Sequence, residues 1–97
     1  MKDFIPTPAF YKKLAEELIN EIDDRTYVST DIEIPDFNGF SLYFKATIIV
    51  YRDRETFEIV DILPIWWEFE AYDFDGNRVS SDGVTFAEIR DTVKRLV

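Results

Sequence analysis

Carboxylates are the side chains of this chain whose types and spacing could do chemistry. Asp61 interrupts an otherwise apolar row of a predicted strand, and a desolvated carboxylate has a raised pKa that suits an acid or base. More often such a residue marks a gap at an edge strand, reaches a helix N-terminus, or pairs with an arginine such as Arg52 or Arg54. We favour the structural role, and keep a small-ligand binder or enzyme that uses Asp61 and nearby tyrosines as an alternative.

Two other acidic patterns are weaker. Glu68 and Glu70 share a face of a regular strand, and paired carboxylates occur in glycoside hydrolysis and in divalent metal sites. No second carboxylate pair is evident, so a solvated strand face is the favoured interpretation. The segment 73–77 has the acids of a calcium loop, but its glycine comes two positions early and Val84 stands where a bidentate glutamate is needed. Its Asp-Gly pair predicts a turn.

The residue types that are missing exclude whole classes of site. The chain has no cysteine and no histidine, which removes disulfides, thiolate nucleophiles, iron–sulfur clusters and the commonest ligands for zinc and acid–base groups. Three isolated glycines could not build a phosphate-binding loop. We therefore expect no catalytic residues, no metal and no cofactor.

The charge is strongly acidic, with 20 Asp and Glu against 11 Lys and Arg and a net charge of −9. A field of that sign repels nucleic acids and anionic membranes, so we expect neither as a direct partner. The acids concentrate in residues 53–77. If they formed a single stripe, the protein could act as an acidic decoy or inhibitor of a basic or DNA-binding protein, which is a second alternative. The N-terminus lacks the apolar stretch of a signal peptide, which favours a soluble, cytoplasmic protein.

The spacing of apolar residues predicts one domain over residues 1–97, with a helix at each end. The first helix follows an N-cap at Thr7 and Pro8, and it ends at Asp23 and Asp24. The last helix begins with the capping box Thr85-x-x-Glu88.

Strands are predicted between the helices. A strand over 27–34 ends at Pro35, and the pair Asn38-Gly39 makes a tight reversal into a strand over 40–52. The region 56–72 follows, with an edge position, bulge or break expected at Pro64, and residues 78–79 begin a short fourth strand. One face of 56–72 is expected to carry these apolar residues: Phe57, Ile59, Leu63, Ile65, Trp67, Phe69 and Ala71.

These elements predict an α+β two-layer sandwich, helix – antiparallel three-to-four-strand meander – helix, with both helices on one sheet face. The opposite face would carry Tyr27, Tyr43, Lys45, Ile49, Tyr51, Val60, Ile62 and Trp66. Of the two adjacent tryptophans, one should be core and the other exposed. The second face is either covered by Phe4-Ile5 or a helix, or it is an interaction surface. The leading hypothesis is a non-enzymatic protein-interaction module, with Tyr43, Ile49, Tyr51 and Trp66 as anchors. A homodimer is its simplest form, because symmetric pairs dominate soluble oligomers.

Overall fold

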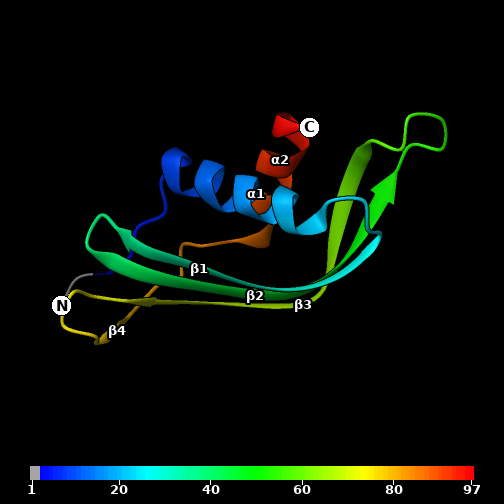
Figure 1. The fold of residues 1–97 in the computed structure, drawn as a ribbon. Coiled ribbons are helices and arrows are strands. Elements are labelled where there is room, and N and C mark those ends of the chain that lie inside the picture. Colours follow the sequence, from blue (N-terminus) through cyan, green and yellow to red (C-terminus); the bar gives the residue numbers. More distant parts are fainter. Residues whose placement is uncertain (1–2) are drawn as a thin grey trace.

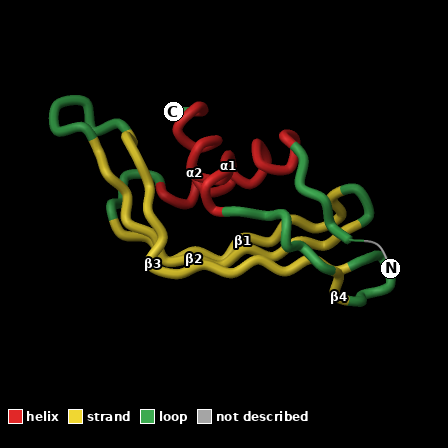
Figure 2. The backbone as a smooth tube through the Cα atoms, turned by 180° about the vertical axis from the view of Figure 1, so that it is seen from behind, coloured by secondary structure: helices red, strands yellow, loops and turns green. Residues whose placement is uncertain are grey.

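The computed structural model describes residues 3–97 as a helix, four strands and a helix in chain order (Figure 1). The elements are α1 (Pro8–Ile22), β1 (Tyr27–Phe37), β2 (Phe40–Arg52), β3 (Ile59–Tyr72), β4 (Arg78–Val79) and α2 (Phe86–Leu96). The strands form one antiparallel sheet in the order β1-β2-β3-β4, and both helices lie over the same face of it (Figure 2). The predicted two-layer α+β fold is confirmed.

Both helices begin at the predicted caps. The hydroxyl of Thr7 accepts a hydrogen bond from the N–H of Phe10 at 3.2 Å, and that of Thr85 accepts one from the N–H of Glu88 at 3.3 Å. The N–H of Thr85 itself donates to the hydroxyl of Tyr11 at 3.3 Å. Tyr11 in turn donates to the carbonyl of Gly83 at 3.3 Å, so a side chain of α1 helps to cap α2.

The C-terminal end of α1 is held by Arg52 at the end of β2. Its guanidinium donates to the carbonyl oxygens of Asp23 at 2.6 Å, Arg25 at 2.9 Å and Phe57 at 2.9 Å. It also lies 4.6 Å from the centroid of the Phe57 ring. A cation at this end complements the helix dipole, which the acidic pair at the end of α1 opposes. Arg52 therefore fixes α1 to the β2–β3 hairpin.

The β1–β2 hairpin follows the sequence closely. Asn38 and Gly39 adopt φ angles of 51° and 87°, as a two-residue reversal requires. The expected end of the strand at Pro35 is an interruption instead: pairing breaks after Ile34 and resumes at Phe37. The alternation predicted for β2 is confirmed, with Leu42, Phe44, Ala46, Ile48 and Val50 buried on the helix side.

Two bulges in β3 change the predicted faces. Thr47 pairs with Trp66 and Ile48 pairs with Pro64, which leaves Ile65 without a partner. In the same way Val60 lies between the pairs made by Asp61 and Ile59. Bulges bend a strand and reverse its alternation, and Figure 1 shows the end of the β2–β3 hairpin turning toward the helix side.

The prediction for β3 was therefore partly wrong. Leu63 and Ile65 are exposed, whereas Ile62, which was expected on the opposite face, is fully buried. Phe57 lies in the loop before the strand and has a φ of 63°. Trp67, Phe69 and Ala71, beyond Pro64, do face the core. The edge position and the bulge expected at Pro64 are both present. β4 pairs with β3 only at Ala71 and Tyr72, so β3 is the edge of the sheet at Pro64, and the bulge lies at the next residue, Ile65.

The core lies between the helices and the inner sheet face. Phe4 is buried there, with its ring centroid 4.9 Å from Phe10, 5.4 Å from Phe40 and 5.7 Å from Phe69. Its neighbour Ile5 is exposed. Among residues 3–97, neither the N-terminal segment nor a helix covers the second face of the sheet, which we call the outer face (Figures 1 and 2).

Candidate interaction surface on the outer sheet face

Strand register places an apolar cluster at one end of the outer face. Tyr27 lies opposite Ile49, and Ile49 lies opposite Leu63, so one row crosses three strands. Trp66 lies in the next row. With Tyr51, two residues beyond Ile49, these side chains form what we call the apolar half: Tyr27, Ile49, Tyr51, Leu63 and Trp66. Their exposed fractions run from 36% for Ile49 to 62% for Tyr27.

The apolar half is packed within itself. Thr47, in the row of Trp66, is 7% exposed although no helix covers it, so its neighbours on this face must enclose it. Its hydroxyl lies 3.0 Å from that of Ser29 in the same row, and the two form a hydrogen bond. These hydroxyls satisfy each other, which leaves a surface that is suited to a dry contact.

Three of the four predicted anchors, Ile49, Tyr51 and Trp66, belong to the apolar half. The fourth, Tyr43, lies six residues from Ile49 along β2, which is about 20 Å in a strand. Leu63 was expected on the inner face, with Trp67 and Phe69. The bulge at Ile65 reverses the alternation of side chains and turns Leu63 to the outer face. The expectation for the two tryptophans is confirmed: Trp66 is 48% exposed and its neighbour packs against the core.

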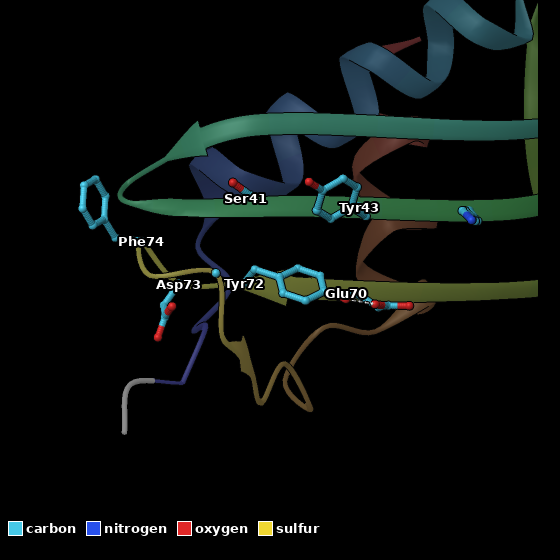
Figure 3. Close-up of a pocket in the computed structure, with 8 residues that line it drawn as sticks. Ser41, Tyr43, Glu70, Tyr72, Asp73 and Phe74 are labelled. Carbon is cyan, nitrogen blue, oxygen red and sulfur yellow. Dashed lines mark hydrogen bonds between the residues drawn. The ribbon is translucent and has the colours of Figure 1, made fainter.

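Tyr43 belongs to what we call the polar half, the residues at the other end of the outer face: Asp31, Glu33, Ser41, Tyr43, Lys45, Glu68, Glu70 and Tyr72. Its ring makes an edge contact with Tyr72, with centroids 5.6 Å apart and planes at 84°. The hydroxyl of Tyr72 donates to Glu70 at 2.5 Å, and this bond raises the pKa of Tyr72 above its ordinary value of 10.0. Figure 3 shows these side chains around an open depression of about 500 Å³, with Phe74 at its edge.

Sequence reasoning missed Tyr72 and Phe74. Tyr72 is two residues after Glu70 and pairs with Ser41, so the period of two could have placed it beside Tyr43. The placement of Phe74 depends on the β3–β4 turn, where the predicted reversal is confirmed. Asp73 accepts hydrogen bonds from the N–H groups of Asp75 at 3.0 Å and Asn77 at 2.8 Å.

The rows of the polar half are rich in carboxylates. Lys45 lies between Asp31 on β1 and Glu68 on β3. In the next row, Tyr43 lies between Glu33 and Glu70, so Glu68 and Glu70 share a face as predicted. These two rows hold four carboxylates and one ammonium, a sum of −3, and Arg78 lies opposite Tyr72 on β4.

Asp61 lies at the exposed edge of β3 and binds Arg90 of α2, so Arg90 takes the place of the expected Arg52 or Arg54. The guanidinium donates to both carboxylate oxygens, at 2.7 and 2.5 Å. These bonds, with one from the N–H of Ile62, lower the pKa of Asp61 from 3.8 to about 2. A lowered pKa is opposite to the raised value on which an acid–base role was based.

The acids of residues 53–77 do not form one stripe. Asp53 accepts hydrogen bonds within the β2–β3 loop, from the N–H groups of Glu55 at 2.8 Å and Thr56 at 3.0 Å. Glu55 and Glu58 lie in the same loop, and Asp61 is paired with Arg90 of α2. Glu68 and Glu70 lie on the polar half, and Asp73 and Asp75 in the β3–β4 turn. The single acidic stripe that a decoy would need is absent from this part of the chain.

Within residues 3–97, no helix has the length and apolar character needed to cross a bilayer. The same residues hold no group of three or more acidic side chains arranged to bind a metal ion. No protein-family model, curated protein or solved structure matches the chain at a significant level. The geometry of the outer face is therefore the basis for a functional interpretation.

Proposed function

We propose that this protein is a non-enzymatic interaction module that pairs with a second copy of itself through the apolar half of the outer face. The observation that carries the proposal is the row Tyr27–Ile49–Leu63, continued by Trp66 and Tyr51. These side chains are exposed and uncharged, and aromatic anchors of this kind dominate protein interfaces. Asp61, which lies opposite Tyr51 at the border of the apolar half, has its charge paired with Arg90.

Charge and shape favour a two-fold arrangement. Two chains of charge −9 repel each other, so a stable pair must keep its acidic regions apart. The molecule is 49 Å long, and the apolar half lies at one end of the outer face. A two-fold axis through that half would direct the two polar halves away from each other. Charges so placed are separated by more than the Debye length of about 8 Å at physiological salt.

The test is the mass in solution, measured by light scattering during size exclusion over a wide range of protein and salt concentrations. We expect a species of twice the 11.5 kDa chain mass, favoured by higher salt because salt screens the repulsion. Tyr51→Glu and Trp66→Glu should each yield monomers, since an unpaired charge buried in an interface costs about 3 kcal/mol or more.

Phe74→Glu is the matched control. It makes the same aromatic-to-carboxylate change at a side chain that is 92% exposed but lies in the β3–β4 turn, outside the apolar half. This variant should remain dimeric. A wild-type protein that stays monomeric throughout, or a Tyr51→Glu variant with an unchanged dimer and intact circular dichroism, would refute the proposal.

A further inference from the structure

The depression on the polar half has aromatic walls. The rings of Tyr43 and Tyr72 meet edge to face, 5.6 Å between centroids, and the 92% exposed ring of Phe74 stands at the rim (Figure 3). Its volume of about 500 Å³ lies within the common range for small-ligand sites. The exposed sides of the Tyr43 and Tyr72 rings can hold a group without enclosing it, while Phe74 lies farther out beside the tip of the β1–β2 hairpin (Figure 3).

One carboxylate of the depression is fixed in place. Glu70 accepts the hydroxyl of Tyr72 at 2.5 Å, which orients the carboxylate and the ring together. A carboxylate has lone pairs for about four hydrogen bonds, so Glu70 can accept a second donor. The raised pKa of Tyr72 keeps its hydroxyl protonated, and the pair therefore persists well above neutral pH.

The surrounding charge selects the sign of a ligand. Lys45 lines the depression, but this lysine lies between two carboxylates, Asp31 on β1 and Glu68 on β3. Glu33 lies beside Tyr43 in the neighbouring row. An anion drawn to the lysine would meet these carboxylates, whereas a cation would meet the aromatic rings and Glu70. The total charge of −9 adds long-range attraction for a cation.

We propose that this depression binds an organic cation, an ammonium or guanidinium group, such as a lysine or arginine side chain or a small amine carries. The rings of Tyr43 and Tyr72 supply cation–π contacts, and Glu70 supplies the opposite charge. The site lies apart from the apolar half, so it does not depend on self-association.

The test is a titration of the protein with small molecules, in which binding is measured by changes in the amide NMR chemical shifts. The probes are choline, its uncharged isostere in which carbon replaces the quaternary nitrogen, methylguanidinium and acetate. We expect the two cations to shift the amides of Tyr43, Glu70 and Tyr72, and the isostere and acetate to leave them unshifted at the same concentrations. Equal binding of choline and its isostere, or shifts caused by acetate and not by the cations, would overturn the proposal.

Variants give the test its specificity. Tyr43→Leu keeps an apolar side chain but removes the ring, and Glu70→Gln keeps the shape but removes the charge. Each should weaken choline binding about threefold to thirtyfold, the range of one cation–π or partly exposed charge contact. Lys45→Met should strengthen binding, because it removes a like charge that lines the depression. Unchanged affinity in both Tyr43→Leu and Glu70→Gln would refute the assignment.

Tyr51→Ala is the control on the same face. It alters the apolar half and should leave choline affinity unchanged, so failure of the dimer and failure of this site are distinguishable. Two further probes separate the sources of the cation: a flexible peptide with a single lysine or arginine, and the free amine alone. Tighter binding of the peptide would indicate a protein side chain, and equal binding would indicate a small amine.

Discussion

The ion pair between Asp61 and Arg90 should stabilise the fold by a measurable amount. It joins α2 to the edge of β3, and the two side chains are 23% and 38% exposed. The pKa of Asp61 falls from 3.8 to about 2. Since each pKa unit is worth about 1.36 kcal/mol, the shift sets an upper limit of about 2.4 kcal/mol. Water reaches Arg90 and screens the pair, so we expect about 1 kcal/mol.

A double-mutant cycle isolates this contribution. Asp61→Asn, Arg90→Gln and the double variant are unfolded with urea at pH 7, at one protein concentration because the proposed self-association would shift the midpoint. We expect a coupling energy of about 1 kcal/mol, and a fall in the melting temperature of about 4–8 °C for Asp61→Asn. Glu17→Gln is the control, because its bond to Lys13 at 3.1 Å is an exposed helix pair worth less than about 0.5 kcal/mol.

The pH dependence has a definite sign. The folded-state pKa of Asp61 lies below the unfolded value, so its stabilisation is complete above about pH 4 and is lost as the pH falls toward about 2. The difference between wild type and Asp61→Asn should shrink across that window. A coupling energy near zero at pH 7, or a difference that does not change between pH 5 and 2, would refute the assignment of Asp61 to a structural pair.

Three further variants test other contacts. Arg52→Ala should lower the free energy of unfolding by about 2 kcal/mol in urea, because three carbonyls lose a charged donor; Arg52→Lys should recover only part of this. Glu70→Gln should lower the pKa of Tyr72 in an NMR titration of the ring, since the carboxylate bond raises it; an unchanged pKa would exclude that bond. Tyr11→Phe should cost about 1 kcal/mol and fray the start of α2 in hydrogen exchange, whereas full protection of the Thr85 amide would contradict its bond to Tyr11.

Local signals predicted the elements well. The caps at Thr7 and Thr85 determine where the helices start through contacts with residues only three positions away. Asn38-Gly39 determines the first reversal, because few other pairs tolerate two positive φ angles. The alternation of β2 predicts its faces because this strand pairs on both sides along its length.

Long-range contacts could not be predicted in the same way. Arg90 lies 29 residues from Asp61, and only the docking of α2 over β3 makes it the partner rather than Arg52 or Arg54. Arg52 is instead engaged by the end of α1. The apolar half depends in addition on two bulges, whose positions are set by the register between two strands and not by either strand alone.

The bulge at Ile65 resolves a conflict that is visible in the sequence of β3. Counting back from Trp66 on the outer face, an unbroken alternation would place Asp61 on the inner face, under the helices. Burying an unpaired carboxylate there would cost several kcal/mol, whereas a lost ladder hydrogen bond costs about 1 kcal/mol. Pro64, which has no N–H to donate, lies next to the bulge and reduces that loss further.

The shifted register turns Asp61 off the inner face and places it opposite Tyr51 on the edge strand β3, where Arg90 reaches it, and it buries Ile62 in its place. The same shift turns Leu63 outward, beside Ile49, and so completes the apolar row of the outer face. The energetic reason for the bulge lies in the core, and the surface through which we propose that the chain pairs is its consequence.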